Sequence, residues 1–509
     1  MRKSPIVGLW ASARGLFFAM LLSGCPGADS IDEKDLAGSD SETQRPQLII
    51  LISLDTLRAD HLGLYGHHRP TSPVLDAFAA QGTVFDDASS TSPWTLPAHT
   101  SILTGLYPRN HRVLTFDTAL PAQVPTLASM LSAAGYQTAA VINSAWLKKE
   151  RYGVTREFEK YLFVDDTQDR RAPNSWITDQ AISWILEAGS QPLFLFVHYY
   201  DVHSDYSSLP EYERLFVTPY AGEADGTGWQ LARASFEDDY LEMCHENYDP
   251  ERCRIGNLEE YLVVDRNVDK VFFDENDLRH LEELYDAGIR QLDNELGRFF
   301  SVLKSEDLLD RSLVIITSDH GEEFMDHGRM DHFLTMHQEV IRVPLIMRGP
   351  EIPSELRVKT PVSLVDIAPT ILSFAGMTHE TALDGLNLAH LLKGKTPEAF
   401  DRRAIFGEAS GGLTYEKMMK GIFPTYRSLR RGKYKIIHDS KQNEWLLYDL
   451  EADPGEEHDL AAKKPELTQR LATEMRQRYL DFDPEPAAHD RVELDADELE
   501  RLRALGYVP

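Results

Sequence analysis

The chain has 509 residues, of which 42% are hydrophobic, so it is too rich in core-forming side chains for a disordered protein and long enough for one large domain or two smaller ones. Acidic residues number 82 against 52 basic residues, which gives a formal net charge of -30. Most of the surface would therefore repel a polyanion, and we expect no nucleic-acid partner.

The N-terminal residues have the pattern of an export signal. Basic side chains precede an apolar run over residues 16–22 that is too short to span a bilayer as a mature helix. The run ends in Leu22-Ser23-Gly24-Cys25, which resembles a bacterial lipobox, in which the cysteine is lipidated and becomes the mature N-terminus. We predict a lipoprotein signal peptide over 1–24, a lipid on Cys25 and a flexible polar tether over 25–45. The chain would then be an exported bacterial lipoprotein, periplasmic or on the cell surface and anchored to a membrane. An ordinary secretory signal is the alternative.

Continuous apolar runs indicate strands that are buried on both faces of a parallel sheet. They cover residues 48–54, 193–197, 313–317 and 344–347. Residues 124–134 and 278–303 have the periodicity of amphipathic helices. Strands that alternate with such helices predict an α/β fold of three layers with a mostly parallel central sheet, spanning residues 46–375.

The apolar pattern weakens inside this domain over residues 204–273, which we interpret as an insertion near the rim of the site. The insertion contains Cys244 and Cys253. In an oxidising compartment they would pair, and we predict that disulfide, with two free thiols as the alternative. So short a loop would add at most about 3 kcal/mol, so the bond would pin the insertion rather than the whole fold.

Residues 376–509 have a different pattern. Short segments at 426–430, 433–437 and 445–448 predict a small antiparallel sheet, and a helix is expected from Pro465 onwards. We therefore predict a smaller C-terminal subdomain.

Polar residues follow two of the predicted buried strands. Asp55 comes directly after the first, and Asp319-His320-Gly321 follows another. Both sets would emerge at the same carboxyl edge of a parallel sheet, which is where open α/β sheets bind ligands. Carboxylates bind hard divalent ions, an imidazole favours transition metals, and a glycine lets the backbone turn sharply beside an ion. The sequence thus predicts a divalent-metal site held by Asp55, Asp319 and His320.

Between these residues lies Ser92-Pro93-Trp94-Thr95-Leu96-Pro97-Ala98-His99, which runs into a helix ending in Thr104-Gly105. Here the chain resembles the sulfatase family within the alkaline phosphatase superfamily. The family motif is Cys or Ser, any residue, Pro, Ser, Arg, and then a helix that ends in Thr-Gly. The resemblance extends from the strand before Asp55, through Asp319-His320-Gly321, to Leu447-Tyr448-Asp449, and so covers nearly all of the mature chain. It implies a hydrolase of sulfate or phosphate esters.

The chain departs from the family motif at three positions. Thr95 stands where a sulfatase has the Cys or Ser that becomes formylglycine, Ala98 replaces the motif Ser, and His99 replaces its Arg. Formylglycine cannot form from threonine, so we expect none. Resemblance to the superfamily's phosphodiesterases and phosphoethanolamine transferases implies that Thr95, activated by a metal, attacks phosphorus. Thr95 is then the predicted nucleophile and a further metal ligand, and His99 a further catalytic residue, whereas a helix N-cap is the alternative role for Thr95.

The resemblance also indicates residues that contact substrate. His203 occupies the position where family members place a substrate-contacting histidine, and we favour it over His198. His332 matches a histidine in the segment that closes over the substrate, with Arg329 as a candidate clamp for an anion. We predict catalytic roles for His203 and His332, and substrate binding by His203 and Arg329.

The identity of the metal depends on a further departure. The family has two adjacent aspartates after the first strand, and here Thr56 takes the second place. A set of Asp55, Thr95, Asp319 and His320 would suit a single Mn²⁺, Zn²⁺ or Mg²⁺ at least as well as Ca²⁺.

Two classes of function follow from these residues. In the first, the chain hydrolyses or transfers the charged group of a sulfated or phosphorylated glycan, lipid or small molecule, and the choice between sulfate and phosphate stays open. In the second, it is a non-catalytic lipoprotein that keeps the fold and binds glycans or lipids through residues 204–273. Fold alone does not decide between them.

Overall fold

The computed structural model describes residues 45–164, 173–235, 270–377, 382–409, 425–440 and 442–480. The predicted signal peptide, Cys25, Cys244 and Cys253 lie outside these ranges. Of the helices within them, none is both long and apolar enough to cross a membrane.

A large sheet is built around β1 (Leu48–Leu54), a strand in which every residue is buried. β1 pairs in parallel with β5 (Leu193–Tyr199) on one side and with β6 (Ser312–Thr317) on the other. The strand order is β10-β2-β9-β6-β1-β5-β3-β4, and β11 also pairs with β2. The remaining strands are β2 (Thr83–Ser89), β3 (Gln137–Ile142), β4 (Lys160–Phe163), β9 (Arg342–Arg348), β10 (Leu356–Val358) and β11 (Val362–Ser363).

β9 runs against its neighbours, because it pairs antiparallel with both β6 and β2. Its apolar run, predicted over residues 344–347, does not reveal this direction, since a strand buried on both faces is apolar whichever way it runs. The predicted mostly parallel central sheet is confirmed, with β9 as an antiparallel member.

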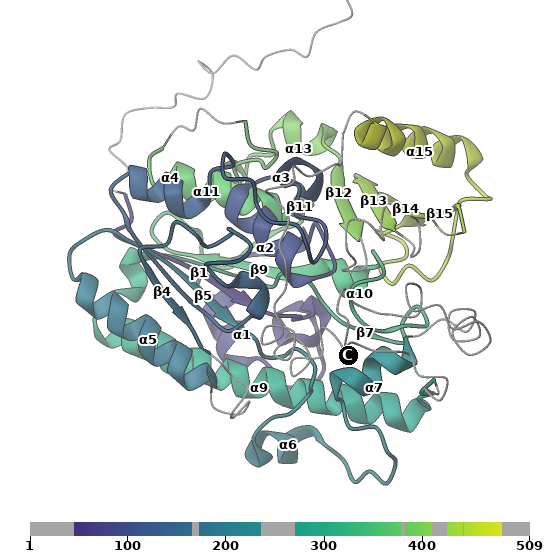
Figure 1. Ribbon diagram of the computed structural model, residues 1–509, viewed down its shortest axis with the longest axis horizontal. Coiled ribbons are helices and arrows are strands. Elements are labelled where there is room, and N and C mark those ends of the chain that lie inside the picture. Colours follow the sequence, from purple (N-terminus) through teal and green to yellow (C-terminus); the bar gives the residue numbers. More distant parts are fainter. Residues whose placement is uncertain are drawn as a thin grey trace, which may run out of the picture. The chain divides into compact units, whose positions relative to one another are not determined.

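Helices cover both faces of this sheet (Figure 1). Successive side chains of a strand point to opposite faces, so a central strand needs two apolar faces. Ile49 and Leu51 belong to the core with α2 (Thr95–Thr104), α4 (Leu127–Ala133) and α11 (Ile367–Phe374). Ile50 and Ile52 belong to the opposite core with α1 (Pro73–Ala79), α5 (Pro173–Ala188) and α9 (Glu275–Ser305). The layered α/β architecture follows from these two cores.

The long helix α9 begins at a well-defined cap. The carboxylate of Asp274 accepts hydrogen bonds from the backbone N–H groups of Asn276 and Asp277, and Asp277 returns the bond to the cap residue. Shorter helices complete this part of the chain: α3 (Pro108–His111), α6 (Pro210–Phe216), α7 (Gly228–Ala234), α10 (Gln338–Ile341), α12 (Ala389–Leu392) and α13 (Glu398–Arg402). α6 and α7 lie within the predicted insertion.

A second, antiparallel sheet follows the large one. Its strands are β12 (Ile405–Ala409), β13 (Tyr426–Arg431), β14 (Tyr434–Asp439) and β15 (Glu444–Asp449), paired in chain order. α15 (Pro465–Leu480) packs Leu471 and Met475 onto the sheet residues Leu429 and Ile436. The predicted C-terminal sheet and helix are therefore confirmed, and β12 adds a strand that the sequence pattern did not predict. The domain boundary after residue 375 stays a prediction.

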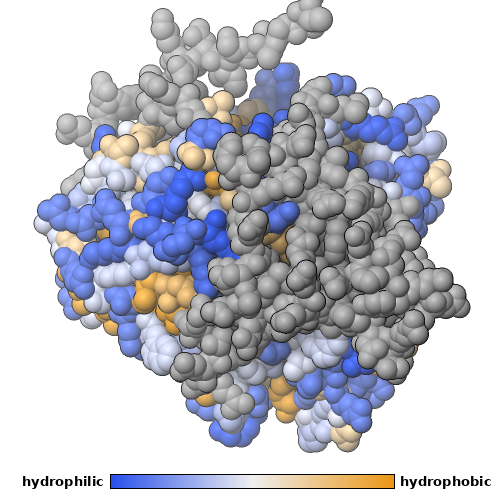
Figure 2. Space-filling view, in the orientation of Figure 1, coloured by the Kyte–Doolittle hydropathy of each residue, from blue (hydrophilic) through white to orange (hydrophobic). Residues whose placement is uncertain are grey.

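On the face drawn in Figure 2, the described residues are mostly hydrophilic, with scattered hydrophobic ones between them. A short hairpin, β7 (Glu323–Phe324) and β8 (Met330–Asp331), lies outside both sheets and carries residues of the site described next.

Candidate active site

Asp55 and Asp319 emerge at the same edge of the large sheet. Ser53 at the end of β1 is in register with Thr317 at the end of β6, so each aspartate lies two residues beyond a matched pair. Both carboxylates are fully buried, and the backbone N–H of Thr56 donates to Asp319 Oδ1 over 3.4 Å. The convergence predicted from the two strand ends is therefore what the structure has.

His320 points a ring nitrogen at both aspartates. Its Nε2 lies 3.6 Å from Asp55 Oδ1 and 3.4 Å from Asp319 Oδ2. Its Nδ1 donates to the backbone carbonyl of Gly321 over 2.9 Å. A carbonyl can only accept, so the proton of the neutral ring sits on Nδ1 and Nε2 offers a lone pair. Burial lowers the pKa of His320 well below 6.5, which keeps the ring neutral.

Several polar atoms of this group have no hydrogen-bond partner among the described residues. Both oxygens of Asp55, Oδ2 of Asp319 and Nε2 of His320 accept or donate no hydrogen bond within the described part of the chain. Burial raises the pKa of Asp55 and of Asp319 to about 8, and for Asp319 the neighbouring Asp55 adds to the effect. Orphaned buried carboxylates are costly unless they are paired or bind a metal. The donor set therefore fits a divalent cation, and Asp55, Asp319 and His320 are the residues that would hold it.

Thr56, the residue after Asp55, has an unusual backbone. Its φ is 54°, in the left-handed region that a β-branched residue rarely adopts. Its carbonyl accepts a hydrogen bond of 2.7 Å from the hydroxyl of Tyr285, which holds this turn in place. Backbone strain of this kind is common at functional sites.

Thr95 is the first residue of α2 and is fully buried. Trp94, not Thr95, occupies the N-cap position, so the predicted alternative role as a cap is not what the structure has. The imidazole of His99 lies one turn on, with Nδ1 2.9 Å from the Thr95 carbonyl oxygen and 3.3 Å from Asp319 Oδ2. Its Nε2 lies 2.8 Å from the hydroxyl of Ser53. His99 thus connects the start of α2 to Asp319 and to β1.

His332 follows β8 and is held by two carboxylates. Its Nδ1 lies 2.7 Å from Asp331 Oδ1 and 3.1 Å from Glu322 Oε1. Burial opposes a charge on this ring, but the two carboxylates outweigh it and raise the pKa of His332 well above 6.5. Nε2 has no hydrogen-bond partner within the described residues, and the ring centroid is 4.5 Å from that of His320. The protonated ring would therefore have an N–H group at Nε2 that is available to donate a hydrogen bond to a ligand.

The segment of His332 also contacts the segment of Thr95. The backbone N–H of Phe333 donates to the carbonyl of Pro93 over 3.1 Å. Asp331 and Phe333 both have positive φ, at 71° and 89°. The hydrogen bond thus joins the segment that contains His332 to the segment that precedes Thr95, although the two are far apart in the sequence.

The other two predicted histidines have distinct positions. His203 donates from Nδ1 to the carbonyl of Ser204 over 2.7 Å, and its ring centroid lies 4.8 Å from that of His332. His198, which the sequence disfavoured, lies deeper, with Nε2 3.2 Å from Asp55 Oδ2. Burial lowers the pKa of His198 to about 3, so it is a neutral neighbour of the metal-site carboxylate. His198 is the penultimate residue of β5 and is in register with Ser53 on β1, which brings it close to Asp55.

Arg329 lies toward the C-terminal sheet. Its guanidinium donates to the hydroxyl of Tyr426 on β13 over 3.3 Å. Burial and then Glu339 raise the pKa of Glu323 well above 4.5, and the charge of Arg329 opposes this rise. Glu322 was not singled out in the sequence, and its contact with His332 is the feature that reveals it. Cys25, Cys244 and Cys253 lie outside the described residues, so their predicted roles stay predictions.

The layered fold and this buried centre define the chain as a hydrolase of sulfuric or phosphoric esters, in the alkaline phosphatase superfamily. The family described as Sulfatase matches residues 47–377, and the family described as N-sulphoglucosamine sulphohydrolase, C-terminal, matches residues 325–482. The chain belongs to the sulfatase family.

Similar proteins cover most of the chain. Arylsulfatase K of Mus musculus is 27% identical over 431 residues, which cover 79% of this chain and 74% of that protein. N-acetylglucosamine-6-O-sulfatase of Bacteroides thetaiotaomicron is 24% identical over 508 residues, covering 87% and 88%. Among solved structures, the phosphonate monoester hydrolase of Agrobacterium radiobacter has a TM-score of 0.65 at 23% identity, covering 89% of this chain and all of that one. The fold is thus shared by hydrolases named for sulfur and for phosphorus esters.

Proposed function

We propose that this chain is a metal-dependent hydrolase that uses the hydroxyl of Thr95 as its nucleophile, with a phosphate ester or phosphodiester as the first-choice substrate. The observation that carries the proposal is the position of Thr95 at the start of α2, connected through His99 to Asp319 and through Pro93 to the segment of His332. A threonine ester of phosphate is a normal enzyme intermediate, whereas the formylglycine route of sulfatases needs an aldehyde that threonine does not supply.

In the proposed reaction, the Thr95 oxygen forms a bond to phosphorus as the bond from phosphorus to the leaving alcohol oxygen breaks. Thr95 releases its hydroxyl proton to solvent, and the leaving alcohol takes a proton from Nε2 of His332. Water then attacks the phosphothreonine, phosphate leaves, Thr95 recovers a proton, and His332 accepts one from the water. The carboxylates of Asp331 and Glu322 support the protonated state of His332 in the first step.

A divalent cation held by Asp55, Asp319 and His320 would lower the pKa of the Thr95 hydroxyl and neutralise negative charge on the transferred group. The roles of this chain's own residues around it are positional. His99 fixes the start of α2 relative to Asp319, and His198 packs against Asp55. The rings of His203 and His332 are in contact, and Nε2 of His332 has no hydrogen-bond partner within the described residues, which suits this pair to bind the anionic ester and its leaving group.

A sulfate ester is the second candidate substrate, and the names of the relatives favour it. The relatives in mouse and Bacteroides are named as sulfatases, and one structural neighbour, with a TM-score of 0.66, is described in complex with its substrate D-glucosamine-2-N,6-O-disulfate. Sulfated glycans are therefore a reasonable panel of test substrates for this chain. We further propose that the chain acts outside the cytoplasm, anchored through Cys25, because of the lipobox pattern.

The test is a hydrolysis screen of matched phosphate and sulfate esters of the same aryl and sugar alcohols, run with Mn²⁺, Zn²⁺, Mg²⁺ or Ca²⁺. Thr95→Ala should lose at least about 10³-fold in rate, whereas Thr95→Ser, which keeps a hydroxyl, should retain part of it. A phosphorylated Thr95 peptide trapped by rapid quenching would identify the intermediate. Full activity of Thr95→Ala would refute the nucleophile, and tight glycan binding without turnover under every metal would favour the non-catalytic alternative.

A further inference from the structure

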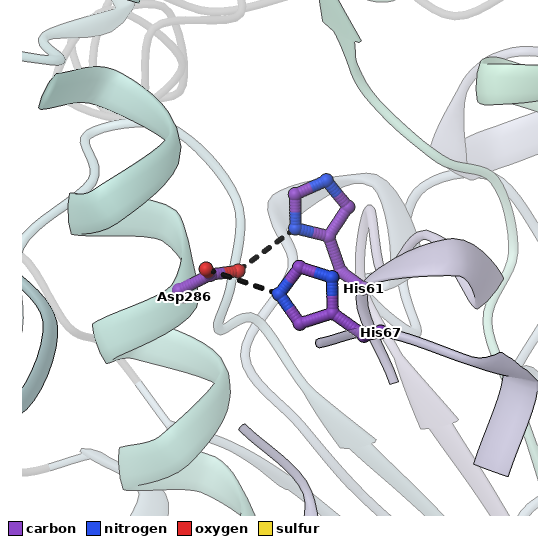
Figure 3. A group of neighbouring side chains, drawn as sticks. All are labelled: His61, His67 and Asp286. Atoms are coloured by element: carbon purple, nitrogen blue, oxygen red, sulfur yellow. Dashed lines mark hydrogen bonds and ion pairs between the residues drawn. The ribbon is translucent and has the colours of Figure 1, made fainter. Parts of the chain in front are cut away.

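A second group of ligating side chains lies apart from the site above, and its two histidines belong to the loop that follows Asp55. His61 ends a short 3-10 helix (Ala59–His61), His67 follows the next one (Gly63–Tyr65), and Asp286 is in the middle of α9. Figure 3 shows both imidazoles directed at the carboxylate from the same side, with the helix behind it. His61 Nδ1 is 2.8 Å from Asp286 Oδ1, and His67 Nε2 is 3.2 Å from Asp286 Oδ2.

The group is built into the protein rather than exposed. His61 is 8% exposed and Asp286 is completely buried, while the side chain of His67 is 10% exposed and leaves a route from solvent. The three potential ligand atoms all lie within 4.8 Å of one another. Ligand atoms of a tetrahedral zinc site, each about 2.0–2.1 Å from the ion, lie roughly 3.3 Å apart. His61 Nδ1 is already near Oδ1, whereas His67 Nε2 is near Oδ2, so a metal on Oδ1 requires the ring of His67 to move toward that oxygen.

We propose that His61, His67 and Asp286 form a second divalent-metal site that takes Zn²⁺ or a similar transition metal and is structural in role. Two imidazoles and one carboxylate are a donor set that zinc prefers, and three protein ligands leave a position for water. Arg69 supports the arrangement, because its Nη1 donates to Asp286 Oδ2 over 2.9 Å and so leaves Oδ1 as the ligating oxygen. Ligating carboxylates are commonly held by such outer hydrogen bonds. Glu283 lies 3.4 Å from Nη2 of Arg69 and balances its charge.

The position of the group gives the metal its role. The neighbouring residue on α9, Tyr285, donates to the carbonyl of Thr56 over 2.7 Å and accepts from the backbone N–H of Arg58 over 2.9 Å. Consecutive residues of one helix therefore hold both ends of the loop that follows Asp55. A metal at His61, His67 and Asp286 would fix the far end of this loop on α9, and so stabilise the turn that presents Asp55.

The competing explanation is a network of hydrogen bonds complete without metal, in which Asp286 accepts from both imidazoles and from Arg69. Metal titration separates the two, because binding displaces the protons from His61 Nδ1 and His67 Nε2. The experiment uses the full-length chain carrying Asp55→Asn and Asp319→Asn, so that the proposed catalytic site contributes no metal. The protein is stripped with a chelator and titrated with Zn²⁺ and with Co²⁺, and bound metal is measured by elemental analysis and by the visible absorption of Co²⁺.

We expect this background to bind one equivalent of metal with a tetrahedral Co²⁺ spectrum and to melt at a higher temperature when Zn²⁺ is present. His67→Gln and Asp286→Asn in the same background should each weaken binding by at least about 100-fold. His68→Gln is the matched control, because His68 is the exposed neighbour of His67 and belongs to no ligand group. His67→Gln alters a partly exposed loop, so a cooperative melt without metal checks that it folds. No binding in the background protein, or equal binding by His67→Gln and His68→Gln, would overturn the proposal.

Discussion

Replacing Gly321 by alanine is the most direct test of how the metal-binding turn is built. A Cβ placed on Gly321 would lie 2.0 Å from the backbone carbonyl oxygen of Glu339, and real Cβ atoms are essentially never closer than 3.0 Å to such an atom. The obstacle is backbone, which a rotamer change cannot relieve. The same residue donates its N–H to the carbonyl of Val340 over 2.6 Å, so the two segments already touch.

The clash has to be relieved by a shift of about 1 Å, which is the difference between these two distances. The carbonyl of Gly321 accepts from His320 Nδ1, so the shift would reach the ring that faces Asp55 and Asp319. A misplacement of this size can cost about 10²-fold in rate, equivalent to about 2.7 kcal/mol in the barrier. Overpacking at such a position costs a further 1–3 kcal/mol or so of stability.

The measurements are metal affinity by titration, hydrolysis rate on the best ester of the screen, and unfolding in urea, for Gly321→Ala against Gly455→Ala. Gly455 is the control, because a Cβ there meets nothing closer than 3.8 Å. We expect the first variant to lose metal affinity and about 10²-fold in rate, and the second to match the parent protein. A Gly321→Ala protein with unchanged affinity and rate would refute the account of this turn.

Two further predictions concern ion pairs: Lys435 with Glu456 in the C-terminal subdomain, and His327 with Glu339 on α10. Lys435 and Glu456 form a buried pair 2.8 Å apart. Lys435→Met should therefore lower the free energy of unfolding in urea by about 3–5 kcal/mol, and adding Glu456→Gln should restore most of this loss. Additive losses in the double variant would contradict the pairing. Burial opposes a charge on His327, but Glu339 at 2.6 Å outweighs it and raises the pKa of His327 from 6.5 to about 9. The contribution of this ion pair to stability is complete below pH 6.5 and is lost as the pH rises through 9. The stability advantage of the parent protein over His327→Gln should therefore shrink across that range. A constant difference between their urea midpoints would exclude the effect.

Much of the fold could be predicted because it depends on local patterns. The apolar runs at β1, β5 and β6 identify strands buried on both faces, and the elements follow the predicted ranges closely. The direction of β9 could not be predicted, since burial on both faces leaves no signature of direction. β12 was missed because its pattern of Ile405-Phe406-Gly407-Glu408-Ala409 includes a glycine and a buried glutamate that pairs with Arg109.

The candidate site divides in the same way. From the sequence alone, Asp55, Asp319 and His320 could be expected to meet, because residues that follow adjacent parallel strands must emerge at one edge. The sequence also predicted a loop that runs into a helix around Thr95, and α2 begins at this residue.

The partners of these residues depend on the tertiary structure. Glu322 precedes β7 and His332 follows β8, so their contact depends on the pairing of these two strands. His198 on β5 reaches Asp55, which follows the neighbouring strand β1. Asp286 meets His61 and His67 from more than 200 residues away in the sequence, as the separation of 225 between Asp286 and His61 shows. Such contacts depend on how helices and loops pack onto the sheet, and periodicity within any one segment carries no information about them.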